Sequence, residues 1–321
     1  MKICVTGGSG LVGNAVKIFS DMLTGHQFYF VSRSYADNNN EKGLNLTVLK
    51  DVDAYFKRHQ FDYIIHLAAN VGGLYKNMNG NIEMFNDNIL INMNVLSVCN
   101  KYNVNRGIFC LSSCIYPDNP SRFPMDETMI HESPPHISNE GYAYAKRMLE
   151  KQCSHYNKAY NREYICLIPV NLYGKHDYFS LKNGHFIPMI MHRFHRDLVL
   201  GDELIAYGTG KPLRQFLYVE DFARIILEVL FGDHYNVTTP LICCGDREYT
   251  IQNIVDMISY YIGVDSDTIL WDTTKSDGCM KKTVSNAKFK SFYPDFQFTP
   301  IDKGLEKTYS WFKENYPYIR K

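Results

Sequence analysis

A glycine-rich turn close to the first residue constrains the fold of this chain more than any other feature. Residues 2–6 are mostly apolar and β-branched, and they lead directly into Gly7-Gly8-Ser9-Gly10-Leu11-Val12-Gly13. From residue 11 to residue 23 the apolar side chains follow helical spacing. Glycines between a strand and a helix permit a tight turn, a close approach of backbone to a pyrophosphate, and close helix–sheet packing. Residues 7–13 therefore predict a dinucleotide site at a helix N-terminus.

Strands and helices alternate through the first half of the chain. Nearly continuous apolar runs predict strands at residues 27–32, 63–67, 107–112 and 164–169. Helical spacing predicts the intervening helices at residues 52–59, 89–102 and 142–160. This alternation indicates a parallel sheet with helices on both faces. We therefore predict an α/β fold built on a Rossmann-type doubly wound parallel sheet.

The pattern changes after Pro169, where loops lengthen and His, Arg and aromatic residues become frequent. Strand, helix and strand at residues 216–219, 221–231 and 241–244 indicate one more α/β unit, and Thr250 precedes a helix as its N-cap. The strand 268–271 and the helix 301–316 close the chain. At about 150 residues per domain, 321 residues suggest two domains. We predict an NADP-binding domain from residues 1–170 plus about 217–245, and a smaller C-terminal α/β substrate-binding domain from residues 171–216 and 246–321.

Charge and cysteine usage limit the classes of partner. The 34 Lys and Arg residues balance 34 Asp and Glu residues, so the chain lacks the basic excess that nucleic acid or a membrane surface requires. No apolar stretch approaches the roughly 18 residues of a membrane span, and the strand pattern at residue 2 leaves no room for a signal peptide. Nine cysteines without a Cys-x-x-Cys pair favour neither a disulfide framework nor a zinc site. We expect a cytoplasmic protein without a metal.

The end of the second predicted strand discriminates between dinucleotides. An acidic residue there would bind the ribose 2′-hydroxyl of NAD, whereas an arginine would accept the 2′-phosphate of NADP. The strand ends in Ser32-Arg33-Ser34, and the next acidic residue is Asp37. The sequence therefore favours NADPH, with Arg33 at the 2′-phosphate.

Three further side chains indicate proton transfer to a carbonyl group. Tyr142 and Lys146 lie one turn apart on one face of a predicted helix. The pKa of a tyrosine is ordinarily near 10, and we expect the Lys146 ammonium to lower it. Ser112 follows the fourth strand, at the sheet edge where such folds bind ligands, and its hydroxyl suits a hydrogen bond to a substrate carbonyl. Together they predict acid–base catalysis at a ketone.

The glycine loop, Ser112 and the Tyr142/Lys146 pair, in this order, resemble the extended short-chain dehydrogenase/reductase family. His66-Leu67-Ala68-Ala69 after the third strand and Pro169-Val170-Asn171-Leu172 after the fifth add to the resemblance. The resemblance implies a homodimer formed through helices of the first domain. It also implies cofactor contacts from Leu67, Ala68, Ala69, Tyr142, Lys146, Pro169, Val170, Asn171, Leu172 and His185.

Additional motifs are similar to those of one branch of this family, whose members both epimerise and reduce a nucleotide sugar. They extend nearly continuously from residue 5 to residue 290, and they include Val71-Gly72-Gly73, Ser112-Ser113-Cys114, Asn171-Leu172-Tyr173-Gly174, His176-Asp177, Gly184-His185-Phe186-Ile187-Pro188 and Thr274-Lys275-Ser276-Asp277-Gly278. The resemblance implies NADPH-dependent 3,5-epimerisation and 4-reduction of GDP-4-keto-6-deoxy-D-mannose to GDP-L-fucose. It also places Tyr207 and Asp277 near the substrate, and the family often has Trp and Lys where this chain has Tyr207 and Arg193.

Epimerisation at two carbons needs acid and base groups beyond Tyr142. Cys114, after the fourth strand, and His185 have side chains suited to proton transfer near neutral pH. The sequence leaves open which of the two is the acid and which is the base. For the diphosphate of the substrate we predict Arg193 and Arg214, because the planar guanidinium matches phosphate oxygens.

Two alternative functions differ from this prediction in identifiable residues. Another nucleotide-sugar epimerase or reductase of the same family would not need the Ser-Ser-Cys and Gly-His-Phe-Ile-Pro segments. A non-catalytic NADP-sensing protein would be expected to lack the Tyr142/Lys146 pair, and this chain has both residues. Fold alone does not separate these functions, because function depends on the site.

Overall fold

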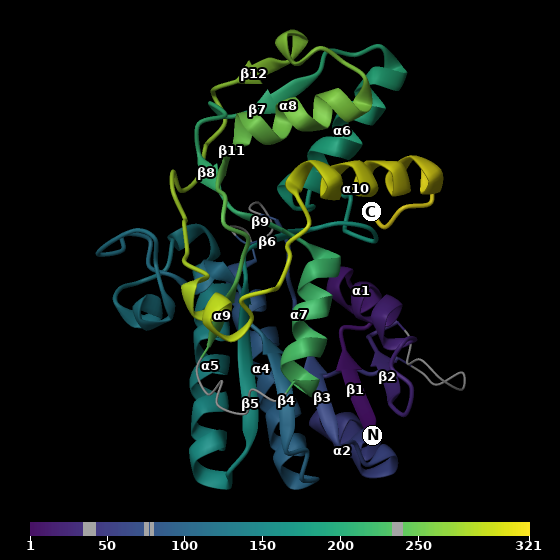
Figure 1. The fold of residues 1–321 in the computed structure, drawn as a ribbon, viewed down its shortest axis with the longest axis vertical. Coiled ribbons are helices and arrows are strands. Elements are labelled where there is room, and N and C mark those ends of the chain that lie inside the picture. The colour runs from purple at the N-terminus through teal and green to yellow at the C-terminus, as the bar shows by residue number, and fades with distance from the viewer. Residues whose placement is uncertain (35–42, 74–76, 78–79, 233–239) are drawn as a thin grey trace.

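A computed structural model describes residues 1–34, 43–73, 77, 80–232 and 240–321 (Figure 1). Two units are arranged along the long axis of the molecule. The lower unit contains the main sheet and its helices, and the upper unit contains smaller sheets with three helices. The strands of the main sheet run from the lower end of the molecule toward the upper unit, so their carboxyl ends face the junction of the two units.

The main sheet confirms the predicted α/β class. Its six strands are parallel and lie in the order β10-β5-β4-β3-β1-β2. The chain leaves β1 toward β2 and returns to the other side of β1 with β3, which makes the carboxyl ends of β1 and β3 a topological switch point where such sheets bind ligands. The strands are β1 (Lys2–Thr6), β2 (Gln27–Val31), β3 (Tyr63–His66), β4 (Arg106–Cys110), β5 (Glu163–Pro169) and β10 (Leu241–Cys243).

The helices of the lower unit pack in two groups that cover the sheet. On one side α1 (Leu11–Ser20) contacts α7 (Val219–Phe231), and on the other α2 (Leu49–His59), α4 (Asn81–Lys101) and α5 (Glu140–Tyr160) pack side by side. The short helix α9 (Ala287–Phe292) packs beside β10, and its Phe289 belongs to the core of this unit. Both groups lie where helices of a doubly wound sheet are expected.

Helix α4 begins eight residues before the predicted start at Ile89. Polar residues on its buried face hide the apolar periodicity: Asn88, Asn92 and Asn94 are buried. Their amides satisfy neighbouring polar groups, since Asn88 Nδ2 donates to Asn70 O at 2.9 Å and Asn94 Nδ2 donates to Leu46 O at 2.9 Å. A pattern of apolar residues alone could not locate this start.

The upper unit has its own core, formed around Phe179, Phe194, Ile254 and Phe312. Helix α8 begins after Thr250 with a reciprocal capping box to Asn253, as the predicted N-cap requires. Strand β9 pairs with β6 rather than extending the main sheet. The elements are β6 (Asn171–Tyr173), α6 (Phe186–Leu200), β7 (Ile205–Tyr207), β8 (Leu213–Arg214), β9 (Phe216–Tyr218), β11 (Tyr249–Thr250), α8 (Ile251–Ile262), β12 (Leu270–Asp272) and α10 (Ile301–Asn315).

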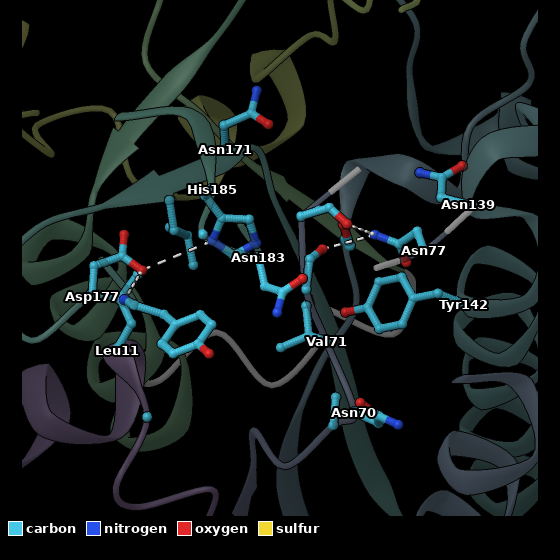
Figure 2. Close-up of a pocket in the computed structure, with 18 of the residues that line it drawn as sticks. Leu11, Asn70, Val71, Asn77, Asn139, Tyr142, Asn171, Asp177, Asn183 and His185 are labelled. Carbon is cyan, nitrogen blue, oxygen red and sulfur yellow. Dashed lines mark hydrogen bonds and ion pairs between the residues drawn. The ribbon is translucent and has the colours of Figure 1, made fainter. Parts of the chain in front are cut away.

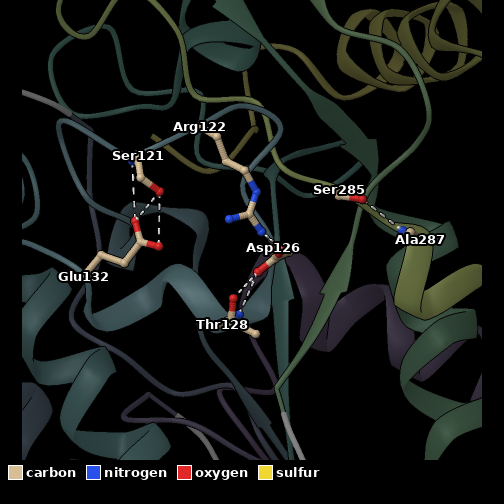
Figure 3. Close-up of polar contacts among 7 residues, drawn as sticks. All are labelled: Ser121, Arg122, Asp126, Thr128, Glu132, Ser285 and Ala287. Atoms are coloured by element: carbon tan, nitrogen blue, oxygen red, sulfur yellow. Dashed lines mark hydrogen bonds and ion pairs between the residues drawn. The ribbon is translucent and has the colours of Figure 1, made fainter.

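A long segment between β4 and α5 is held in place by polar contacts (Figure 3). Ser121 donates to the carboxylate of Glu132, Arg122 pairs with Asp126, and Asp126 caps the following turn by accepting from Thr128 N at 3.0 Å. Backbone bonds join Met125 to residues 283 and 285, at 2.9 and 2.7 Å. The segment therefore fixes the chain that follows β4 against the start of α9.

Candidate active site

A cleft of about 1030 Å³ lies between the two units, above the carboxyl ends of the main sheet. Nearly all of the site residues predicted from the sequence line it. The exceptions are Gly8 and Cys114, which lie just behind its wall. Gly8 packs against Phe30 and donates its backbone N–H to Val31 O at 3.0 Å, so it contributes packing of the turn rather than cleft surface.

The glycine loop requires glycine for steric reasons. Gly7 has φ +75°, and a Cβ there would lie 2.8 Å from Ala68 N. A Cβ on Gly13 would lie 2.5 Å from Gly7 O, so helix and turn could not approach as they do. The first turn of α1 has no acidic residue and no side-chain cap. Its free N–H groups and positive dipole end are therefore open to an anion, as a dinucleotide pyrophosphate requires.

His66 supports the turn beside this loop rather than acting in catalysis. Its Nδ1 is hydrogen-bonded to Thr6 Oγ1 at 2.8 Å, and its Nε2 to Asn92 Oδ1 at 3.1 Å. Thr6 Oγ1 in turn accepts from Leu67 N and Ala68 N, at 3.2 and 3.3 Å. Burial lowers the pKa of His66 to about 3, so the ring is neutral. The network fixes residues 67–69 against the cleft.

The outer end of the cofactor side of the cleft is formed by Ser32, Arg33 and Ser34. Arg33 is exposed there, within reach of the space that continues from the glycine loop. The hydroxyls of Ser32 and Ser34 are hydrogen-bonded to each other at 3.1 Å. Asp37, the first acid after the strand, lies outside the described residues.

The three side chains predicted to act on a ketone meet at the centre of the cleft. Ser112 follows β4, and α5 carries Tyr142 and Lys146. Lys146 Nζ donates to Cys110 O at 2.6 Å and lies 5.7 Å from the centre of the Tyr142 ring. Arg147 on the same helix donates to Ile115 O at 2.7 Å, which ties α5 to the turn after β4. The positions of these groups are therefore mutually fixed.

The electrostatics of Tyr142 differ from the sequence-based expectation. Burial raises the pKa of its hydroxyl well above the ordinary value, and Lys146 does not reverse this effect. Burial also lowers the pKa of the Lys146 ammonium. The expectation of a lowered Tyr142 pKa considered the charge of Lys146 and omitted the desolvation of both groups. The phenol therefore retains its proton at neutral pH, as a proton donor must.

Cys114 is 9% exposed and lies behind Ser112 and Ser113. Its backbone N–H donates to Ser112 Oγ at 3.3 Å. Burial raises the pKa of its thiol, and the positive charge of Lys282 opposes that effect. Lys282 itself lines the cleft.

His185 is the N-cap residue of α6 and faces Tyr142 from the opposite wall (Figure 2). Its side chain is 45% exposed, because it faces the open cleft. Desolvation by the cleft walls lowers its pKa, but the interaction with the Asp177 carboxylate outweighs this and leaves the pKa above its ordinary value. The two walls of the cleft thus present a phenol and an imidazole to the same space.

The part of the cleft formed by α6, β7 and β8 carries cations and an aromatic ring. The Arg193 guanidinium lies over the Tyr207 ring at 4.0 Å, and Lys275 Nζ lies 5.8 Å from the same ring. Burial lowers the pKa of Arg214, which also lines the cleft. Asp277 accepts from Thr209 N and Thr209 Oγ1, both at 2.7 Å, and these bonds lower its pKa. Asp277 therefore fixes the loop at residues 208–210 in addition to any contact with substrate.

Several cleft residues were not predicted from the sequence. Asp177 and Lys275 stood in recognised motifs without an assigned role, whereas the others had no local signal because they come from scattered loops and the C-terminal segment. They are Asn77, Asp177, Tyr178, Lys182, Lys275, Lys282 and Arg320.

The described residues contain no group of three His, Cys, Asp or Glu side chains arranged to hold a metal ion. Within the same residues, no helix has both the length and the apolar character that crossing a membrane would require. The fold and the cleft define a dinucleotide-dependent oxidoreductase of the Rossmann type whose cleft has a second wall built by the upper unit.

Comparison with known proteins makes this class more specific. Residues 3–237 match the NAD dependent epimerase/dehydratase family. The chain is 40% identical to the GDP-L-fucose synthase of Dictyostelium discoideum, over 99% of this chain and 97% of that protein. It is 39% identical to the probable GDP-L-fucose synthase of Drosophila melanogaster, over 100% and 99% of the two chains. The chain belongs to the GDP-L-fucose synthase family, which confirms the resemblance found in its motifs.

A solved structure agrees with the fold. The crystal structure of a GDP-L-fucose synthetase from Naegleria fowleri bound to NADP has a TM-score of 0.89 and 38% sequence identity to this chain. The match covers 100% of this chain and 95% of that one. The Rossmann-type architecture predicted from the sequence is therefore confirmed.

Proposed function

We propose that this protein catalyses the NADPH-dependent 3,5-epimerisation and 4-reduction of GDP-4-keto-6-deoxy-D-mannose, which gives GDP-L-fucose. The observation that carries the proposal is the convergence of the glycine loop, Tyr142 and His185 on one cleft, with Arg193 and Arg214 at its far end. The family assignment supports the same activity, since relatives 40% and 39% identical to the chain are named for it.

The cofactor side of the cleft fits NADPH. The tight turn that Gly7 and Gly13 permit and the N–H groups at the start of α1 suit the pyrophosphate, and Arg33 suits the 2′-phosphate. Residues 67–69 and 169–172 line the cleft together with Tyr142, Lys146 and His185, and these residues would hold the nicotinamide riboside. When bound, the cofactor supplies the hydride that reduces C4.

Reduction at C4 needs a proton as well as a hydride. Tyr142, whose buried hydroxyl holds its proton, donates that proton to the C4 oxygen, and Ser112 donates a hydrogen bond to the same oxygen. Lys146 uses one N–H on Cys110 O, which leaves two for the cofactor ribose. Its positive charge also stabilises the phenolate that remains after proton transfer.

Epimerisation removes a proton next to the ketone and returns one on the opposite face of the sugar ring. Cys114 lies just behind the sheet side of the cleft and His185 lines the α6 side, so the two groups lie on opposite sides of the space for the sugar ring. His185, with its raised pKa, serves as the acid, and Cys114 serves as the base with Lys282 stabilising the thiolate. Arg193 and Arg214 bind the diphosphate, and Tyr207 and Asp277 complete the substrate side.

The direct test is a product assay. The purified protein is incubated with GDP-4-keto-6-deoxy-D-mannose and NADPH, and the product is identified by NMR. We expect GDP-L-fucose and one NADPH consumed for each product molecule. A GDP-6-deoxyhexose with unchanged configuration at C3 and C5 would favour a plain reductase, and NADP binding without turnover would favour the non-catalytic NADP-sensing alternative.

We further propose that the protein is a homodimer assembled through α4 and α5. Ile82, Leu90 and Met93 are exposed on α4 at helical spacing, and Met148 is exposed on the adjacent α5. Such an apolar surface on neighbouring helices suits burial against a second copy. Light scattering after size exclusion tests this, and a monomeric mass at micromolar concentration would contradict it.

The domain division and the location also remain proposals. We propose an NADP-binding domain of residues 1–170 and about 217–245 and a substrate-binding domain of residues 171–216 and 246–321, which the two separate cores support, although α9 packs on the first core. We propose a cytoplasmic location, because all nine cysteines are free, as is usual in a reducing compartment.

A further inference from the structure

Asp177 is placed beside His185 by an unusual turn after β6. Gly174 and His176 both have positive φ, +152° and +64°, and the Asp177 N–H closes the turn by donating to Gly174 O at 3.4 Å. The turn buries the Asp177 carboxylate, which is 2% exposed, in the wall of the cleft. A non-glycine residue with positive φ is uncommon, and such residues gather at functional sites.

The carboxylate of Asp177 has one oxygen in use and one without a partner. Oδ1 accepts the backbone N–H of Tyr178 at 2.7 Å and lies 3.9 Å from His185 Nδ1 (Figure 2). Oδ2 is buried and has no hydrogen-bond partner among the described residues. Burying a carboxylate oxygen without a partner is costly, so its retention calls for an explanation.

We propose that Asp177 is the positioning residue for His185. Its carboxylate accepts the Nδ1–H of the imidazole after a small rotation that shortens the 3.9 Å separation to a hydrogen bond. That bond fixes the ring orientation and the tautomer, so that Nε2 faces the sugar ring in the cleft. The inference rests on the proposed epimerase function of His185 and deepens it.

The charges around His185 support this role. Asp177 is the anion beside it, Arg320 from the C-terminal segment exerts an opposing positive charge, and Lys182 and Tyr142 also line the surrounding cleft. The Asp177 interaction prevails, so the pKa of His185 stays above its ordinary value. The imidazole is thus kept in its protonated form closer to neutral pH than an isolated histidine would be.

The proton transfer balances with this arrangement. The electron pair of the substrate enolate forms the new C–H bond with the Nε2 proton, the Nε2–H bond breaks, and the ketone is restored. The neutral imidazole keeps its proton on Nδ1, where it is hydrogen-bonded to the Asp177 carboxylate. Solvent returns a proton to Nε2 before the next proton transfer. Asp177 therefore touches neither the substrate nor the transferred proton.

The test combines a titration with an exchange measurement on the full-length protein. The His185 signal in histidine-labelled protein is assigned with His185→Gln and titrated by NMR. In Asp177→Asn we expect the pKa of His185 to fall by about one pH unit or more. Deuterium incorporation at C3 and C5, measured without NADPH, is expected to fall about 10- to 100-fold, which is less than the roughly 10²- to 10⁴-fold of a general acid itself because Asp177 acts only through His185. Binding of NADPH, measured alongside, checks that the variant is folded.

Two other variants make the result specific. Asp202→Asn removes an exposed carboxylate near the end of α6 and is expected to change neither measurement. Asp177→Glu keeps the negative charge but moves the oxygens by one methylene group, so the pKa of His185 remains raised while exchange slows. It also serves if the asparagine variant fails to fold.

The outcomes separate this proposal from the proposed function. An unchanged His185 titration in Asp177→Asn, or wild-type exchange in that variant, would overturn the positioning role while leaving the epimerase intact. If the wild-type protein shows no exchange at all, the epimerase function fails. In that case an unchanged titration overturns the Asp177–His185 pairing and a lowered pKa upholds it.

Discussion

The two walls of the cleft differ in whether they present backbone groups or side chains. The lower wall presents mainly backbone: the glycine loop, the N-terminus of α1 and the turns after β3 and β5. The upper wall presents side chains, chiefly His185, Arg193, Tyr207 and Arg214, from α6, β7 and β8. A backbone surface suits a common cofactor, whereas a side-chain surface can be altered residue by residue for one substrate.

The same contrast explains how far sequence reasoning could reach. Strands β1, β3, β4 and β5 were predicted because they are apolar runs of four or more residues, and the glycine loop was predicted because its spacing is local. Helix α6 escaped prediction because buried His192 and Arg193 interrupt its apolar face. Strands β7 and β8 also escaped prediction, because two or three residues are too few to show a period.

Contacts between side chains in the site could not be predicted from the sequence for a similar reason. The stacking of Arg193 on Tyr207 and the bonds from Thr209 to Asp277 join residues far apart in the chain. The depth of Cys114 and the effect of burial on Tyr142 depend on packing, which residue type and spacing do not report. The residues that line the cleft could therefore largely be predicted, but not their protonation.

The largest expected effect separates chemistry from cofactor binding. Tyr142→Phe removes the proton donor to the C4 oxygen and leaves the glycine loop untouched, so we expect NADPH oxidation to fall about 10²- to 10⁴-fold. NADPH affinity, measured by fluorescence titration, stays within about twofold of wild type because a single neutral hydroxyl contributes little to binding. Substantial NADPH oxidation by the variant would require another acid.

The next effect tests the division between the two chemistries. Cys114→Ser is expected to slow deuterium uptake at C3 and C5 by about 100-fold or more, since the base is lost. Reduction continues through Tyr142 and Lys146 and gives GDP-6-deoxyhexoses of the wrong stereochemistry. His185→Asn is also expected to lower deuterium uptake at C3 and C5, because the paired acid is lost. Normal exchange in both variants, with only about 1 kcal/mol lost in stability, would make the two residues structural.

A smaller effect tests the backbone character of the lower wall. Gly13→Ala places a Cβ 2.5 Å from Gly7 O, so the turn must shift away from its position against α1. We expect the Kd for NADPH to rise about tenfold or more, equivalent to about 1.4 kcal/mol. Gly245→Ala is the matched control, because its Cβ would meet no heavy atom within 4 Å. Equal NADPH affinity in the two variants would show that the close approach is unnecessary.

The smallest effect concerns the one side chain of the lower wall that we assign to cofactor choice. Arg33 lies exposed at the end of β2, where its guanidinium can donate charged hydrogen bonds to a 2′-phosphate. Arg33→Ala removes those bonds, so the ratio of kcat/KM for NADPH to that for NADH is expected to fall about tenfold. Arg58→Ala, on α2 away from the residues that line the cleft, controls for a general loss of positive charge. Because NADH lacks the phosphate, its own kcat/KM stays unchanged in Arg33→Ala. An unaltered ratio would mean that the backbone of the lower wall, and not Arg33, discriminates between the two cofactors.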